Sequence, residues 1–416
     1  MKRLARTALS LWMMLMALGC APSIAQLERH LDANRFDRAV ETAADSPAMQ
    51  VELAALILER AAKDEARTSE MITILKGAGK PGKRALQRLV DDSEDGVVRQ
   101  AEVALHRYSP PEGKDLALYL EHDSSDVRER AARKWYSEMD AATLEMLLVD
   151  RDPRVRRWAA KGLCRFNGAH GTDALLRDAL RLDPDSKVRA EAARCGKCLG
   201  RDALLVLKAA LDDKNLGVRL AVIQGLSETG DENALTIVEE RAAGPIDEMT
   251  VAAAAELSRL GNPLGKERLD AALESDRPVI RQAALLRLER ARVQDRDAIF
   301  VRMLGDEAPG VVLLVAGLLS SREEINPAVP NALRRLVEEA GSYSEKARDQ
   351  LAVLGDQNAL EQVAKALDDA EEATLLTVLT RVRRAVGLAH RFVKLMGNES
   401  ESIRIAAARA TLATVR

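Results

Sequence analysis

Polar and apolar positions along the chain repeat in one order, at intervals of about 30 residues. Each unit opens with a polar residue of the kind that caps a helix, and an Arg preceded by Val or Ile follows four residues later. Small residues, mostly alanine, come next, and an Ala-Leu pair opens a second apolar segment that ends at an acidic turn. This order predicts tandem helical hairpins. The repeated arginines are Arg99, Arg128, Arg156, Arg189, Arg219, Arg281 and Arg404.

The repeat predicts the fold class. A single hairpin can bury its apolar face only against its neighbours, so the units should stack along one axis. We therefore expect an all-α, right-handed α-solenoid of about eleven hairpins over residues 61–416. Aromatic residues make up only 3 % of the chain, and no stretch alternates as a strand does. Residues 26–60 lack the repeat and predict an N-terminal helical-hairpin cap, with helices near 24–31 and 36–44.

One copy of the repeat carries a family resemblance. It runs from Leu216-Gly217-Val218-Arg219 to Gly230-Asp231-Glu232-Asn233-Ala234-Leu235, and resembles HEAT repeats of the phycobilisome-lyase-like subfamily. The resemblance covers residues 61–416, although several units are degenerate. It implies that first helices line the convex side of the solenoid and second helices the concave side, where partners bind. It also implies that the repeated Arg pairs with an acidic cap of an adjacent repeat.

The N-terminus predicts export. Residues 1–19 place three basic residues before a short apolar stretch, which is well below the 20 or so residues of a membrane-spanning helix. The sequence Ala17-Leu18-Gly19-Cys20 resembles a bacterial lipobox, so we expect lipidation of Cys20 and a tether over residues 20–25. The alternative is ordinary cleavage after Ala25.

The resemblance to lipoproteins implies a location, and the charge limits the partner. Lipoproteins with a residue such as Ala21 after the lipidated Cys usually reach the outer membrane, so we expect a periplasmic or surface-facing outer-membrane lipoprotein. The alternative is a soluble periplasmic or secreted protein. Removal of residues 1–19 takes the net charge from −3 to −6, which disfavours nucleic acid. We expect a protein partner in the cell envelope and no small-molecule substrate.

Basic residues are densest near residue 157. Arg154, Arg157, Lys161 and Arg165 share one helix face, which could meet an acidic partner or lipid headgroups. The alternative is an ordinary solvated face on the convex side.

The cysteines form the only cluster with potential chemistry. In the repeat register Cys164, His170, Cys195 and Cys198 approach the same edge of two stacked units. We expect Cys195 or Cys198 in a disulfide, with Cys164 as the cross-repeat candidate partner, as fits an oxidising periplasm. The alternatives are a zinc site with three Cys and one His, and free or partly oxidised thiols. Thioredoxin-like catalysis is disfavoured, because the Cys-x-x-Cys pair lies near a helix C-terminus, where the helix dipole opposes a thiolate.

Catalytic motifs are lacking. The five histidines are scattered, and the sequence holds no nucleophile elbow, phosphate loop or zinc-protease motif. We predict a non-enzymatic scaffold without a cofactor, which binds an envelope protein along its concave face. The alternative is an enzyme accessory or a metal or redox module centred on the four residues of the cysteine cluster. The candidate contact residues, on the outward faces of second helices, are Arg177, Arg181, Lys208, Glu239, Arg302 and Arg335.

Overall fold

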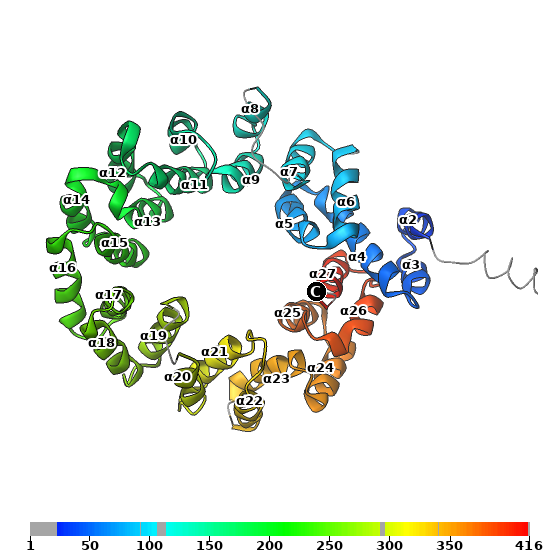
Figure 1. Cartoon of the computed structure of the whole chain (residues 1–416). Helices are drawn as coiled ribbons and strands as arrows, with labels where there is room; N and C mark the ends of the chain where they lie inside the picture. The colour runs from blue at the N-terminus through cyan, green and yellow to red at the C-terminus, as the bar shows by residue number, and fades with distance from the viewer. Residues whose placement is uncertain (1–22, 92, 106–113, 292–295, 340, 415–416) are drawn as a thin grey trace, which may run out of the picture. The chain divides into compact units, whose positions relative to one another are not determined.

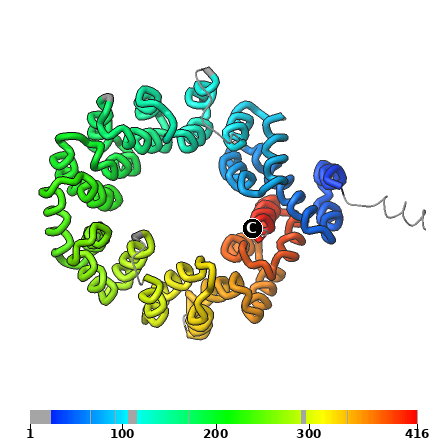
Figure 2. Tube along the Cα trace, in the orientation of Figure 1, coloured from blue at the N-terminus to red at the C-terminus, as the bar shows by residue number. Residues whose placement is uncertain are grey.

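The protein is an α-solenoid. A computed structural model describes residues 23–91, 93–105, 114–291, 296–339 and 341–414, and these residues form helices and turns without a strand (Figures 1 and 2). The predicted fold class is thus confirmed. None of the described helices has the length and apolar character needed to cross a bilayer. The export segment and Cys20 lie outside the described residues.

The chain divides into two compact units. Unit 1 combines the two ends of the chain, Met1–Leu105 and Arg348–Arg416, and unit 2 is the stretch His106–Ala347 between them.

Unit 2 consists of two layers of helices. The first helices of successive hairpins contact one another in a row, and the second helices form the other layer. In Figure 1 the first helices lie on the concave side of the arc that unit 2 forms, and the second helices lie on its convex side. This arrangement is the reverse of what the family resemblance implies. The first helices are α9 (Ser125–Trp135), α11 (Pro153–Leu163), α13 (Ser186–Arg194), α15 (Leu216–Glu228), α17 (Glu248–Arg259), α19 (Pro278–Ala291) and α21 (Pro309–Leu319). The second-layer helices are α8 (Lys114–Leu120), α10 (Ala141–Leu148), α12 (Thr172–Leu182), α14 (Ala203–Ala210), α16 (Glu232–Ala243), α18 (Pro263–Leu273), α20 (Arg296–Met303) and α22 (Ala328–Glu339).

Small residues account for the close packing of the first helices. The paired alanines of the repeat are fully buried, as in Ala159 and Ala160 of α11. A Cβ atom added to Gly225 of α15 would overlap the backbone carbonyl of Ala193 in α13. Because the first layer is packed this closely, its helices fit on the inner side of a curve, where less length is available per repeat.

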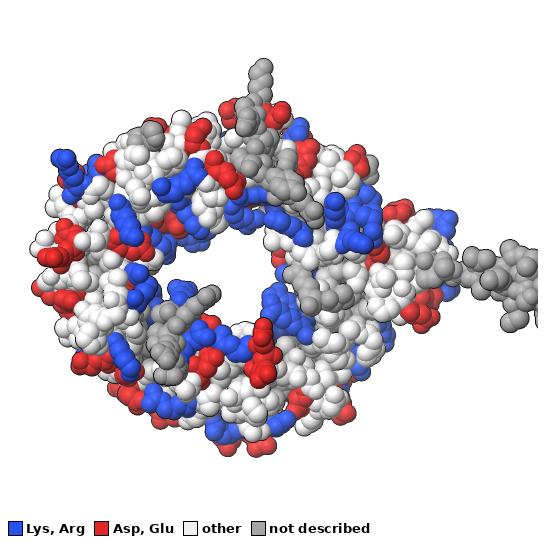
Figure 3. All heavy atoms as spheres, viewed as in Figure 1, with Lys and Arg blue, Asp and Glu red and all other residues white. Residues whose placement is uncertain are grey.

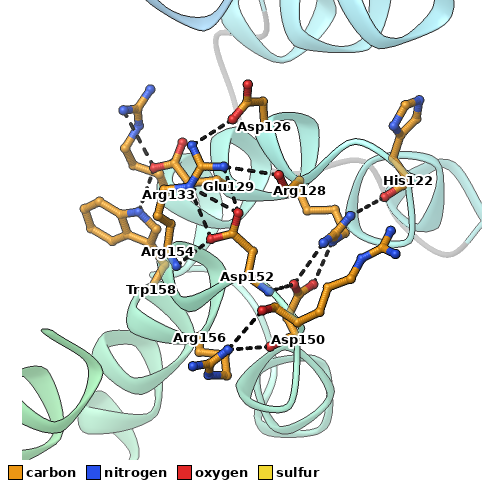
Figure 4. Close-up of polar contacts among 12 residues, drawn as sticks. His122, Asp126, Arg128, Glu129, Arg133, Asp150, Asp152, Arg154, Arg156 and Trp158 are labelled. Carbon is orange, nitrogen blue, oxygen red and sulfur yellow. Dashed lines mark hydrogen bonds and ion pairs between the residues drawn. The ribbon is translucent and has the colours of Figure 1, made fainter. Parts of the chain in front are cut away.

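The repeated arginines join each turn to the next. Arg128 donates from Nε and Nη2 to the Asp150 carboxylate at 2.7 and 3.0 Å, and from Nη1 to the carbonyls of His122 and Asp123 (Figure 4). The Asp150 carboxylate also accepts the backbone N–H of Asp152 at 2.7 Å. The same bidentate pair recurs three times, as Arg156 with Asp183, Arg189 with Asp213, and Arg281 with Asp306.

For these four arginines the network confirms that the repeated Arg pairs with an acidic residue of the adjacent repeat. Arg99 pairs with carboxylates of its own helix, and Arg219 and Arg404 donate to backbone carbonyls.

In the four pairs the Asp lies two residues before the expected cap. The cap residue Asp152 instead accepts the N–H of Arg154 in its own helix, at 2.8 Å. At three of these four Arg–Asp pairs, which we call rungs, one Asp therefore binds the Arg and a second polar residue caps the next helix. At the fourth rung the cap position is Ala308, which makes no side-chain cap.

Unit 1 is held together by the two ends of the chain. Helix α27 packs against α4, and α26 packs against α3. One buried cluster contains Leu53 and Leu58 of α4 together with Ile405 and Leu412 of α27. Helix α27, the last of the described helices, is therefore covered by α4. The helices are α2 (Ile24–Asp32), α3 (Phe36–Ala43), α4 (Pro47–Ala62), α5 (Glu65–Lys76), α6 (Gly79–Asp91), α7 (Asp95–Leu105), α24 (Gln357–Asp369), α25 (Glu372–Val382), α26 (Ala389–Leu395) and α27 (Glu401–Thr414), with α23 (Ser344–Val353) spanning the boundary with unit 2.

Charged pairs add to this contact between the chain ends. Arg67 of α5 pairs with Glu401 at 3.2 Å, and Arg409 pairs with Glu70 at 2.7 Å. The guanidinium of Arg404 lies 3.7 Å from the ring centroid of Phe36. The sequence-predicted helices at 24–31 and 36–44 are present as α2 and α3, and they belong to this joined region.

Candidate protein-binding surface

The contact residues predicted from the sequence lie on the convex layer of unit 2. Several of them bind neighbouring parts of the fold: Arg177 donates to Asp173 and to the Leu199 carbonyl, both at 2.7 Å. Glu239 accepts from the Asn262 side chain at 2.8 Å. Arg335 donates to the Leu304 carbonyl at 2.8 Å, and Arg302 pairs with Glu274 at 3.4 Å. Arg181 and Lys208 are exposed. The predicted concave position of all six residues is wrong, because second helices occupy the other side.

Cationic side chains line the concave side instead. Three first helices in succession carry an exposed cation five residues beyond the repeated Arg, namely Arg133, Lys161 and Arg194. The opposite face of each helix is buried against the second layer, so these side chains face the concave side. Figure 3 shows Lys and Arg gathered there, while acidic side chains are frequent on the convex side near α16 and α18.

Two aromatic rings lie among these cations. Tyr136 and Trp158 stack with their ring centroids 5.2 Å apart at an angle of 29°. The Lys161 ammonium lies 4.9 Å from the Tyr136 centroid and 5.0 Å from that of Trp158, and the Arg157 guanidinium lies 4.9 Å from Trp158. Both rings are half-buried. We call Arg133, Tyr136, Arg157, Trp158 and Lys161 the basic–aromatic patch.

A buried carboxylate positions the patch. The Trp158 indole donates from Nε1 to Glu129 of α9 at 3.0 Å, and Arg133 pairs with the same carboxylate at 3.8 Å (Figure 4). Glu129 is only 8 % exposed. The indole orientation is therefore fixed from the neighbouring helix. In the part of the chain that the structure describes, no carboxylate pairs with Arg157 or Lys161, and the rings hold both cations by cation–π contact.

Cations continue along the row of first helices. The pKa of Arg287 in α19 is lowered by burial and by the nearby charges of Arg290 and Arg194. Burial, together with the charge of Arg133, lowers the pKa of Arg130 to about 10. Burial is the main cause of both shifts, and a nearby like charge adds to each of them.

Carboxylates interrupt this basic surface. Glu191 lies beside Arg194 at 3.3 Å in α13, and Glu256 lies beside Arg259 at 2.9 Å in α17. The concave side therefore presents separate cationic positions divided by acidic ones, rather than one continuous basic groove.

The basic residues in and just after α11 fall into two groups: some bind other parts of the fold, and others are available to bind a ligand. Arg154 pairs with Asp126 and Asp152, each at 2.7 Å, and Arg165 donates to the Met139 carbonyl. Arg157 and Lys161 remain for a ligand. Sequence reasoning missed the two aromatic residues of the patch. The available signal was Trp158 three residues before Lys161, a spacing that places both on one helix face.

The cysteines meet as the sequence predicts, but as thiols. Cys164 follows α11, Cys195 and Cys198 follow α13, and the Sγ atoms of Cys164 and Cys198 are 3.5 Å apart. A disulfide bond would need about 2.05 Å, and all three cysteines are free. The expected disulfide is therefore absent from this structure. Hydrogen bonding to Cys195 raises the pKa of the Cys164 thiol to about 12, and that of Cys198 is raised by Cys164.

The described residues contain no group of His, Cys, Asp and Glu side chains arranged to hold a metal ion. The side chain of His170 lies outside the described residues. The thiols with raised pKa values are poor thiolate ligands and poor nucleophiles at neutral pH.

Comparison with known proteins shows which family the repeats match. A family profile described as HEAT repeats matches residues 113–197 and 174–259, which span α8 to α17 and include the basic–aromatic patch. No curated protein matches the sequence. These residues of unit 2 thus match HEAT repeats, the class to which the family resemblance points.

Two solved structures are similar to the chain. The complex of CpcE and CpcF of phycocyanin lyase from Nostoc sp. PCC7120 is 20 % identical over 66 % of this chain and 95 % of that one, with a TM-score of 0.25. An engineered protein is 17 % identical over 87 % of this chain and 98 % of its own, with a TM-score of 0.29. Structural similarity at these TM-scores gives no information about activity.

Proposed function

We propose that the protein is a non-enzymatic scaffold that binds a protein partner on the concave side of unit 2, through the basic–aromatic patch. The observation that carries this proposal is the stacked pair of Tyr136 and Trp158, held half-exposed beneath two cations without carboxylate partners. Tyr, Trp and Arg are the residues that dominate binding energy at protein interfaces. The rings are already fixed, so binding them costs little conformational entropy.

The HEAT repeats support this assignment. A solenoid offers an extended concave surface that rigid neighbouring repeats hold in place. In unit 2 the Arg–Asp rungs Arg128–Asp150 and Arg156–Asp183 flank the patch on the turns of α9 and α11. They fix the two helices that carry the aromatic rings, so the surface is preorganised.

Site-specific photocrosslinking in the producing cells tests this function. A photoreactive residue replaces Lys161 in one variant and Lys208, an exposed residue of α14 on the convex layer, in the control. We expect a defined crosslinked protein from position 161 and none from position 208. Crosslinks from position 208 alone would contradict binding on the concave side. No crosslinked protein from either position would contradict the scaffold function.

The proposed partner lies in the cell envelope. The lipobox-like sequence at Cys20 supports a lipid tether to the outer membrane, with residues 1–19 removed. Replacement Cys20→Ala should abolish lipid labelling and release the protein from membranes. Unchanged labelling and fractionation would favour ordinary cleavage after Ala25 and a soluble periplasmic or secreted protein.

A second candidate function is a redox module at the three cysteines. The 3.5 Å contact between Cys164 and Cys198 favours it, because a small movement would allow a disulfide between two consecutive repeats. Bond formation would release two protons and pass two electrons to a disulfide oxidant of the envelope. Mass mapping of the exported protein without reduction tests this module. Three alkylatable thiols would contradict it, and a Cys164–Cys198 cross-link would support it.

A further inference from the structure

The basic–aromatic patch also indicates the chemistry of the partner. We infer that it recognises an acidic peptide segment whose carboxylates are spaced to match successive first helices, an inference that rests on the proposed function. Three features of unit 2 carry this step: the register of the cations, the placement of the aromatic rings, and the carboxylates that lie between the cations.

The cations recur once per helix. Arg133, Lys161 and Arg194 occupy the same position of α9, α11 and α13, so their spacing is set by the packing of these helices. Packed helices lie about 8–10 Å apart. A peptide in the polyproline II conformation has three residues per turn and rises about 3.1 Å per residue, so carboxylates at every third residue lie on one face and recur at about 9 Å. Such a segment can place one carboxylate at each of the three helices.

The stacked rings of Tyr136 and Trp158 distinguish one position in this row of cations, that of Lys161, as a binding site. Lys161 lies over both Tyr136 and Trp158, which leaves its ammonium at the surface without a carboxylate partner. A peptide carboxylate that approaches Lys161 therefore also brings its aliphatic stem against the two rings. The contact combines a charge-assisted hydrogen bond with burial of apolar surface.

The carboxylates of the row argue against a nucleic acid. Glu191 and Glu256 lie beside the cations of α13 and α17, and Glu129 lies beneath the patch. A phosphate backbone carries a charge at every nucleotide and would meet these carboxylates as well as the cations. A peptide with spaced charges can place neutral residues opposite them.

Fluorescence anisotropy with labelled peptides tests the inference on the purified full chain. The probe is a peptide of about twelve residues with Glu at every third position, which spans about 37 Å in the polyproline II conformation. The matched peptide carries Gln at those positions, and a single-stranded oligothymidylate represents nucleic acid. We expect the Glu peptide to bind, and to bind at least about tenfold more tightly than either of the others.

Protein variants locate the binding. The substitution Lys161→Glu should weaken the Glu peptide at least about tenfold, whereas Lys208→Glu, an equal charge change on the convex layer, should leave it within about twofold. Bound peptide should also change tryptophan emission, and Trp158→Phe should remove this change while the buried Trp135 remains. Circular dichroism checks that each variant is folded.

The outcomes separate this inference from the proposed function. A protein crosslinked at position 161 together with no preference for the Glu peptide would leave the scaffold intact and overturn the acidic peptide. The acidic-peptide inference would also be overturned if the oligonucleotide bound as tightly as the Glu peptide, or more tightly, and if Lys161→Glu abolished that binding. An equal loss in Lys161→Glu and Lys208→Glu would show a general charge effect and contradict recognition by the patch.

Discussion

Units 1 and 2 are built from the same kind of helical hairpin but are held together differently. In unit 2 four of the repeated arginines bind a carboxylate of the next turn, and the partners are nearly buried, as in Arg281 and Asp306 with side chains 6 % exposed. In unit 1 the Arg at the same register position, Arg404, lies over Phe36 and donates to the Asn398 and Glu399 carbonyls. Unit 1 depends instead on an apolar cluster shared by distant parts of the chain.

The two units therefore differ in whether their stabilising contacts join neighbouring or distant parts of the sequence. The rungs of unit 2 join residues 22 to 27 positions apart, so neighbouring repeats order one another. Unit 1 joins α4 to α27 across almost the whole sequence, and neither end is complete without the other. The proposed binding surface lies in the unit whose stabilising contacts are local, where a row of repeats is available to a partner.

The largest expected effect is the loss of α27. Deletion of residues 401–416 removes Ile405 and Leu412 from the apolar cluster, and each large aliphatic side chain lost from a core costs about 2–5 kcal/mol. We expect hydrogen exchange to increase strongly across α4 and α5, while α11 to α15 remain protected. Unchanged protection of α4 would mean that the contact between the chain ends contributes little.

Arg189 tests a rung of unit 2. Replacement Arg189→Ala leaves Asp213 without its bidentate partner in a nearly buried site, which should cost about 3–5 kcal/mol of unfolding free energy. The matched substitution Arg404→Ala in unit 1 should cost less, because it strands no buried carboxylate. Denaturant unfolding, monitored locally by hydrogen exchange, measures both. Equal losses would remove the distinction between the two units.

Gly225 tests the close packing of the first helices. A methyl group at this position would overlap the Ala193 carbonyl, so Gly225→Ala should destabilise unit 2 by about 1–3 kcal/mol. Gly230 provides the control at a turn with open space around it, although its φ of +75° adds a backbone cost of its own. Separation of α13 from α15 should appear as faster exchange of both helices in Gly225→Ala, and of neither in Gly230→Ala.

The smallest expected effect is a pH dependence. Arg189 lowers the pKa of Asp213, so this carboxylate binds a proton less readily in the folded than in the unfolded protein. Its contribution to stability is therefore present above the unfolded value of about 3.9 and is lost as the pH falls through the lower folded value. The stability difference between the wild type and Asp213→Asn should shrink on acidification below about pH 4. A constant difference would show that the charge of Asp213 is unimportant.

The sequence predicted the repeats because each element has a local signal. The cap Asp152, the Val155-Arg156 pair and the buried Ala159-Ala160 pair all lie within one helix and its turn, and all take their predicted structural roles. The convergence of Cys164 and Cys198 followed from the same register.

The orientation of the layers could not be predicted in the same way. Curvature depends on how closely each layer packs, and the overlap that excludes a side chain at Gly225 arises between helices rather than within one. The contact of α27 with α4 joins segments without any common motif. The proposed binding surface was not predicted for the first reason, since the face that carries Lys161 could be assigned to the convex side as readily as to a partner.

The most direct test of the concave assignment compares two charge reversals of equal size. One variant carries Arg133→Glu and Lys161→Glu on the first helices, and the other carries Arg181→Glu and Lys208→Glu on the convex layer. Each is produced in the native cells, and the crosslinked partner recovered with it is quantified against the wild type. The account predicts at least about a tenfold loss for the first variant and recovery within about twofold for the second. Full recovery with the first variant, or loss with the second alone, would contradict it.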